Sequence, residues 1–174
     1  MEQQQSEVIA PQPRRIRVID LSKCIGCGAC EAACEALYGM PFIKVYRVGA
    51  SIYIPISCMH CQKAPCVAVC PTKAMHVGSD GFIYVDKAKC IGCLACLEAC
   101  PFGIPELEPK LRVVTKCDLC RDLRAKGLDP ACSAICPTGA LVYGLEDRVF
   151  SEVKRRVAEY IARAQKETPY YLRK

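Results

Sequence analysis

The sequence of 174 residues lacks the features of several familiar protein classes. No run approaches the roughly 18 apolar residues that a membrane-spanning helix needs, so any membrane attachment is expected to come through another subunit. Asn is absent altogether, a minor trait of heat-adapted proteins. Neither a Ser-His-Asp set nor a phosphate-binding loop is found. The chain is therefore expected to perform no substrate chemistry of its own and not to be an enzyme by itself.

We also expect no secretory leader at the start of the chain. Residues 1–13 are polar and contain Pro, and we expect them to form a disordered arm. Arg14 and Arg15 resemble the start of a twin-arginine signal, but the segment that follows is short and is interrupted by Arg17 and Asp20. The expected location is therefore the cytoplasm, although a partner with an export signal could carry the chain across a membrane.

Cysteine, in contrast, is abundant, with 16 residues. An ordinary core never needs this fraction, so bound metal is expected to supply much of the folding free energy. The formal net charge of +6 counts the thiols as neutral. Four thiolates around a [4Fe–4S] core give about −2, so four such clusters would bring the protein to a net charge of about −2. The basic residues are scattered and not interleaved with aromatics, which argues against a nucleic-acid surface.

The cysteines form four groups that repeat one pattern of spacing. Groups one and three have the spacing C-x2-C-x2-C-x3-C, and group two has x2, x4 and x3. Group four has x2, x11 and x3, because residues 121–131 are inserted between its second and third cysteines. In order, the groups are Cys24, Cys27, Cys30 and Cys34; Cys58, Cys61, Cys66 and Cys70; Cys90, Cys93, Cys96 and Cys100; and Cys117, Cys120, Cys132 and Cys136.

The spacing of groups one and three is that of bacterial ferredoxins, in which three cysteines bind one [4Fe–4S] cluster and the fourth binds another. Gly26 and Gly92 suit the tight loops that such binding needs. Zinc sites use two separated C-x2-C pairs, and disulfide frameworks are typical of shorter secreted chains, so both alternatives are disfavoured. The sequence therefore predicts four [4Fe–4S] clusters with all 16 cysteines as metal ligands.

Short β-branched runs predict strands at residues 16–19, 43–48, 51–56, 75–77, 82–85 and 140–143. Turns are expected at 49–50 and 78–81, and a short helix is expected after the third cysteine of each group. Residues 149–163 have the apolar period of an amphipathic helix, which either packs on the protein itself or docks a catalytic subunit. The expected fold class is α+β, with two ferredoxin-like halves that each hold two clusters, short hairpins, short helices and the C-terminal amphipathic helix.

Further residues around the cysteines carry a family resemblance. They include Cys58-Met59-His60-Cys61, Lys116-Cys117-Asp118-Leu119-Cys120 and Cys136-Pro137-Thr138-Gly139-Ala140. With these motifs, residues 16–150 resemble the four-cluster ferredoxin-like electron-transfer subunits of molybdenum and tungsten pterin oxidoreductases, which also occur with hydrogenases and carbon monoxide dehydrogenases. The resemblance implies a pairing that spacing alone leaves open, since adjacent groups could equally pair. In the implied scheme, the first and last groups share one pair of clusters and the middle two groups share the other.

The resemblance implies four cofactor-binding sets: Cys24, Cys27, Cys30 and Cys136; Cys117, Cys120, Cys132 and Cys34; Cys58, Cys61, Cys66 and Cys100; and Cys90, Cys93, Cys96 and Cys70. The expected domains are an arm at 1–13, a first-and-last half at 14–57 and 101–148, a middle half at 58–100, and a C-terminal helix and tail at 149–174. His60 lies between ligands and is expected to be structural, because sixteen thiolates already satisfy four clusters. Lys23, Lys89 and Lys116 each precede a first ligand, and each either raises a cluster potential or is simply solvated.

The expected function is therefore that of a non-catalytic subunit that relays single electrons through four [4Fe–4S] clusters. Its partners would be a larger catalytic subunit, such as a formate dehydrogenase or aldehyde oxidoreductase, and an external acceptor such as a soluble ferredoxin. Two alternatives stay open at this point. The chain could be a free-standing polyferredoxin carrier, or the partner of a hydrogenase or carbon monoxide dehydrogenase.

Overall fold

A computed structural model describes residues 15–167 of the chain, so the expected arm at 1–13 and the residues after 167 lie outside the described part. Contacts divide the chain into two units, of which one is the body, Arg17–Tyr143, and the other contains the C-terminal helix. The elements are β1 (Arg15–Ile19), η1 (Leu21–Lys23), α1 (Ala29–Tyr38), β2 (Ile43–Val48), β3 (Ile52–Ser57), α2 (Pro65–Ala68), β4 (Met75–Val77), β5 (Ile83–Val85), α3 (Ala95–Glu98), β6 (Glu106–Glu108), β7 (Val113–Thr115), α4 (Arg121–Ala125), α5 (Ala131–Ala134), β8 (Leu141–Leu145) and α6 (Glu146–Glu167).

The described strands form four two-stranded sheets. Three are antiparallel pairs of neighbours along the chain: β2 with β3, β4 with β5, and β6 with β7. The fourth pairs β1 with β8, which brings the start of the body next to its end. Sequence analysis predicted the first two hairpins and the outer strands within one or two residues. The strands β6 and β7 were not predicted, because Glu-Leu-Glu and Val-Val-Thr are too short to show a period.

The expected positions of the short helices were wrong by a few residues. Each of α1, α2, α3 and α5 begins one residue before the third cysteine of its group and not after it. In groups one and three, the residue just before the helix has a positive φ, 72° at Gly28 and 62° at Leu94. The chain therefore turns directly from the ligand loop into the helix, and the third cysteine lies in the first helical turn.

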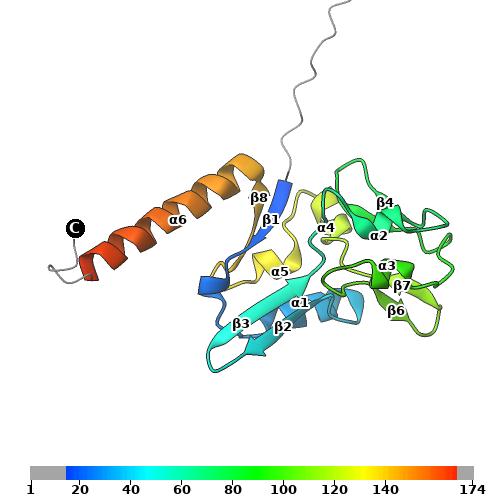
Figure 1. The fold of residues 1–174 in the computed structure, drawn as a ribbon, viewed down its shortest axis with the longest axis horizontal. Coiled ribbons are helices and arrows are strands. Elements are labelled where there is room, and N and C mark those ends of the chain that lie inside the picture. Colours follow the sequence, from blue (N-terminus) through cyan, green and yellow to red (C-terminus); the bar gives the residue numbers. More distant parts are fainter. Residues whose placement is uncertain (1–14, 168–174) are drawn as a thin grey trace, which may run out of the picture. The chain divides into compact units, whose positions relative to one another are not determined.

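Two apolar cores in the body are built around cysteines. Cys30, Cys34 and Cys132 pack with Ile43 and Leu141, where α1 contacts α5 and β2. Cys96 packs with Met75, Ile83 and Val114, where α2 contacts α3 and β4. Within the body, Figure 1 shows α1, β2, β3 and α5 together and α2, α3, β4, β6 and β7 together. The thiols therefore occupy positions that aliphatic side chains fill in ordinary cores.

The C-terminal helix α6 is longer than expected, because it begins at Glu146 and ends at Glu167. Val149 is buried, whereas Val157 and Ile161 on the same stripe are 52% and 50% exposed. No helix in the described residues is long and apolar enough to cross a membrane. The short hairpins, short helices and terminal helix confirm the α+β class.

Candidate cluster sites

One cavity in the body is lined by four cysteines from two groups. Cys24, Cys27 and Cys30 of group one face Cys136, the last cysteine of group four. Val45 of β2, Pro55 of β3 and Leu141 of β8 line other parts of its wall, together with residues that flank the cysteines, such as Thr138. The β1–β8 pairing explains this meeting of distant segments, since the amide of Asp20 donates to the carbonyl of Ala140 at 2.7 Å and fixes the two ends together.

A second cavity repeats this arrangement in the middle of the sequence. It is lined by Cys90, Cys93 and Cys96 of group three and by Cys70, the last cysteine of group two. Backbone amides point at two of these sulfurs. The amide of Met75 donates to Cys70 Sγ at 3.3 Å, and that of Val114 donates to Cys90 Sγ at 3.2 Å. Such amides stabilise thiolates and the negative charge of a bound cluster.

The eight other cysteines form two further sets, and in each set neighbouring sulfurs help to raise the pKa of at least one member. The pKa of Cys66 is raised, first by burial and then by the sulfurs of Cys58, Cys100 and Cys61, while Lys116 works in the opposite direction. These four cysteines are the third set that the family resemblance implies.

The remaining set combines Cys34 with group four. The pKa of Cys34 is raised, first by burial and then by the sulfurs of Cys120 and Cys132, against the lowering effect of the Phe42 amide. Burial raises the pKa of Cys117 to about 12, and the Cys132 sulfur contributes in the same direction. The structure thus brings every predicted ligand close to members of the set in which the resemblance places it.

Adjacent sets also lie close to one another. Burial and then the sulfur of Cys132 raise the pKa of Cys30 to about 11. The first cavity therefore lies beside the group-four set. Burial has the largest effect on the pKa of Cys117, and the Cys58 sulfur raises this pKa as well. The pKa of Cys96 is raised first by burial and then by the sulfur of Cys66. The four sets therefore follow one another in space through these neighbouring sulfurs.

Exposure of the cysteines differs along this series. Cys27 and Cys93, which belong to the two outer sets, are exposed. Cys58, Cys117, Cys120 and Cys132, which belong to the two inner sets, are buried. Each outer set thus includes one cysteine that is exposed at the surface of the protein.

Thiol donors, nearby amides and tight loops together fit [4Fe–4S] clusters. At Gly92, between two ligands of the second cavity, an added Cβ would lie 2.3 Å from the backbone oxygen of Arg112, and φ is +65°. Within residues 15–167, no three His, Cys, Asp or Glu side chains lie close enough together to share one metal ion. In a cubane each thiolate binds a different iron, so its ligands are spaced more widely than those around a single zinc ion.

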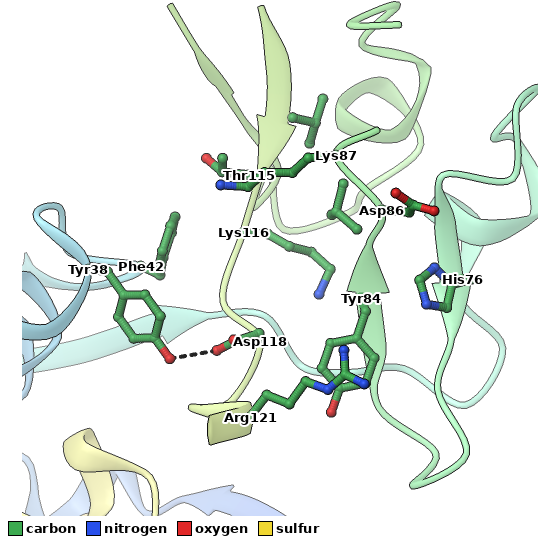
Figure 2. A pocket seen from close by; sticks show the side chains of 12 residues that line it. Tyr38, Phe42, His76, Tyr84, Asp86, Lys87, Thr115, Lys116, Asp118 and Arg121 are labelled. Carbon is green, nitrogen blue, oxygen red and sulfur yellow. Dashed lines mark hydrogen bonds between the residues drawn. The ribbon is translucent and has the colours of Figure 1, made fainter. Parts of the chain in front are cut away.

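A polar pocket beside the Cys117–Cys120 segment shows how this segment is held (Figure 2). The Tyr38 hydroxyl, at the end of α1, donates to Asp118 Oδ1 at 2.8 Å. The guanidinium of Arg121 lies 4.6 Å from the centre of the Tyr84 ring. Because α1 also carries Cys34, the Tyr38 contact keeps Cys34 near the group-four ligands.

The insertion in group four forms the helix α4 and supplies Arg124, which ties the ligand loop to the β4–β5 hairpin. Its Nε donates to the carbonyl of Leu119 at 2.7 Å, and its Nη1 pairs with Asp80 Oδ2 at 3.0 Å. Its guanidinium also donates to the Tyr84 hydroxyl and lies over the Phe82 ring. The inserted segment is therefore a brace between two parts of the body that carry different ligand sets.

His60 is 4% exposed and is held by the protein, in line with the expected structural role. Its Nδ1 accepts the amide of Ile83 at 3.0 Å, and its ring meets Phe82 edge to face. Burial, together with the charges of Lys116 and Arg17, lowers the pKa of His60 to about 2. The ring is thus a neutral group among cations.

The lysines that precede the first ligands differ in their environments. Lys116 is buried, and its Nζ donates to the carbonyls of Ile83 at 2.5 Å and Cys117 at 2.9 Å. The side chain of Lys89 is 64% exposed and pairs with Asp86 at 3.0 Å. Lys89 is therefore a solvated lysine, whereas Lys116 is a buried charge next to ligand cysteines.

Arg17 contacts ligand cysteines and was not predicted as a site residue from the sequence. Arg17 lies in β1, and its guanidinium contacts Cys132, Ser57 and Cys58. The available signal was a charged residue within the apolar strand 16–19, which served only as an argument against a leader peptide.

Comparison with known proteins agrees with this geometry. Residues 50–146 match the 4Fe-4S dicluster domain, and residues 17–36 match the 4Fe-4S binding domain. The protein belongs to the 4Fe-4S dicluster family. Iron–sulfur clusters are therefore the cofactors of this dicluster protein, and the resemblance predicted from its motifs is confirmed.

Its relatives include subunits of several reductases. The thiosulfate reductase electron transfer subunit of Salmonella typhi is 42% identical over 80% of this chain and 79% of the relative. The B subunit of the polysulfide reductase of Wolinella succinogenes is 39% identical over 72% of this chain and 73% of the relative. The B subunit of the anaerobic dimethyl sulfoxide reductase of Escherichia coli is 37% identical over 75% of this chain and 73% of the relative.

Proposed function

We propose that this dicluster protein is the electron-transfer subunit of an oxidoreductase complex and that it holds four [4Fe–4S] clusters in series. Its relatives are subunits of reductases, and one is named as an electron transfer subunit. The observation that carries the proposal is the proximity of neighbouring cysteine sets. Cys30 packs with Cys132, Cys66 packs against the core that contains Cys96, and Arg17 reaches both Cys132 and Cys58. The chain is not the catalytic component of such a complex.

The proposed ligand sets are those that the family resemblance implies, with the last cysteine of each group bound to the cluster of its partner group. The two outer sets are supported by the cavities that their four cysteines line. When bound, each cluster supplies one-electron redox chemistry. The thiolates hold it, backbone amides such as that of Val114 stabilise the sulfur charge, and the apolar cores limit access of water.

The domain division we propose follows from these sets. A first-and-last half, within 14–57 and 101–148, would hold the clusters of groups one and four, and a middle half, 58–100, would hold those of groups two and three. The contact of α1 with α5 supports the first half, and the contact of α2 with α3 supports the second.

The partner we propose is the catalytic subunit of a molybdenum pterin reductase. The reductases named among the relatives act on thiosulfate, polysulfide and dimethyl sulfoxide, so a sulfur-containing substrate is the favoured class. The outer sets, with exposed Cys27 and Cys93, would face the catalytic partner and a second redox partner such as a ferredoxin. We place this exchange in the cytoplasm.

Anaerobic purification of the native protein from its source tests the proposal. The expected result is co-purification with a larger molybdenum-containing subunit, and bleaching of the brown colour of the complex on reduction. Isolation as a lone monomer with full cluster content would instead favour a diffusible carrier. Selective loss of one cluster in Cys136→Ser, with the exposed Arg47→Gln variant as the control, tests the ligand scheme separately.

A further inference from the structure

Arg17 lies where the two inner ligand sets meet. Its Nη1 is 3.8 Å from Cys132 Sγ, and its Nη2 donates to the carbonyl oxygen of Cys58 at 2.8 Å. The same nitrogen contacts Ser57 Oγ, and Ser57 is fully buried. One guanidinium therefore contacts a cysteine of group four and the first cysteine of group two.

The charge of Arg17 is permanent, and the ligands surround it. Burial opposes the charge, but the sulfurs of Cys117, Cys132 and Cys58 outweigh this effect, so the pKa of Arg17 is raised. Within the described residues, its side chain donates to a sulfur, a hydroxyl and a carbonyl oxygen. An arginine held in this way directs its charge at the ligands, because its planar fork fixes the guanidinium in place.

A second cation lies near the same two sets. Lys116 Nζ is bound to the carbonyl of Cys117, a member of the group-four set, and its charge also acts on Cys66 of the other inner set. We call Arg17 and Lys116 the cationic junction. Neutral His60 is influenced by both members, which shows that the two charges share one region of the body.

We propose that the cationic junction raises the reduction potentials of the two inner clusters relative to the two outer ones. The inner clusters are those of the sets Cys34, Cys117, Cys120 and Cys132, and Cys58, Cys61, Cys66 and Cys100. This inference rests on the proposed four-cluster function. Reduction adds one electron to a cluster and breaks no bond, so a nearby fixed cation stabilises the reduced and more negative state.

The effect is expected to be selective because the cysteines that act on Arg17 belong to the inner sets. At the effective dielectric constant of a protein interior, one charge a few ångströms away changes a one-electron equilibrium by about tenfold or more. A tenfold change corresponds to about 59 mV for one electron. An electron passing between the halves would thus be held at the inner pair before it moves to an outer cluster.

The test is a redox titration, followed by electron paramagnetic resonance, of the full chain with all clusters assembled. Arg17→Gln is expected to lower two of four midpoint potentials by about 59 mV, which is a tenfold change, and to leave the other two in place. Arg17→Lys keeps the charge and is expected to retain most of the wild-type potentials. Arg47→Gln is the control, since Arg47 is an exposed arginine of β2 whose Nη2 donates to the Ala50 carbonyl at 2.8 Å.

Several outcomes would overturn the inference. These are unchanged potentials in Arg17→Gln, an equal shift of all four clusters, or the same shift in Arg17→Lys as in Arg17→Gln at full iron content. If Arg17→Gln does not assemble, Lys116→Met must lower the same two potentials, and unchanged potentials in that variant refute the proposal. A wild-type protein with fewer than four redox-active clusters would instead refute the proposed function.

Discussion

Replacement of Gly92 by alanine should disable the second cavity while a similar replacement elsewhere is tolerated. Gly92 lies between the ligands Cys90 and Cys93 and has a φ of +65°. An added Cβ would lie 2.3 Å from the backbone oxygen of Arg112, and a backbone atom cannot move aside as a side chain can. Gly103 has a similar φ of +59°, but an added Cβ there meets nothing within 4 Å.

Both variants carry the free-energy cost of a left-handed backbone, but only Gly92→Ala adds a steric clash. A left-handed backbone costs a non-glycine residue about 1 to 2 kcal/mol, and both alanines incur this cost. Gly92→Ala adds a steric cost of about 1 to 3 kcal/mol, and relief requires the segment at Arg112 to move. Two residues later, Val114 donates its amide to Cys90 Sγ at 3.2 Å, so this movement also weakens a contact to a ligand.

The assay is anaerobic cluster loss in guanidinium chloride, followed by the decay of visible absorbance, together with the iron content of the purified variants. A difference of 2 kcal/mol in the barrier to opening corresponds to about a thirtyfold faster loss. Gly92→Ala should therefore lose one cluster early or be purified without it, whereas Gly103→Ala should keep all its iron. Equal rates and equal iron contents in the two variants would refute this interpretation of the loop.

The remaining predictions concern the brace and the ligand scheme. Arg124→Met should destabilise the protein by roughly 2 to 4 kcal/mol, because it leaves carbonyl and carboxylate partners unpaired, whereas exposed Arg47→Met should change the denaturation midpoint little. Hydrogen bonds from Tyr84 and Arg124 lower the pKa of Asp80 below its ordinary value of 3.8, despite the opposing effect of burial. Its contribution is therefore present above about pH 4 and is lost as the pH falls, so cluster-loss rates of wild type and Asp80→Asn should differ at pH 7 and converge at acidic pH. Finally, Cys34→Ser should perturb the spectrum of the group-four cluster and not that of the first cavity; the opposite pattern would contradict the shared ligand sets.

Cysteine spacing made the ligand loops predictable because a cluster fixes three closely spaced thiolates to nearly one geometry. The hairpins β2–β3 and β4–β5 could also be predicted, since their apolar runs are flanked by turn residues. The starts of the helices were misplaced; at α3 the reason is the positive φ of Leu94, which the sequence does not reveal in a residue other than glycine. The pairing of Cys136 with group one depends on the β1–β8 contact, which is a long-range property that spacing cannot encode.

The sequence also does not predict the roles of Arg124 and Arg17, which connect distant segments of the body. Arg124 lies in an insertion with no obvious period, and its partners Asp80 and Tyr84 come from a hairpin about forty residues earlier in the sequence. Arg17 is a lone charge in a short strand, and only folding brings it to Cys132 and Cys58. Side chains of this kind act through contacts that are distant in sequence, so their identity alone does not reveal their role.

Metal analysis of the anaerobically purified and reconstituted protein tests the central claim most directly. Four [4Fe–4S] clusters predict about sixteen iron atoms and about sixteen acid-labile sulfides per polypeptide, with no zinc. A plateau near eight iron atoms, or zinc in place of iron, would contradict the account.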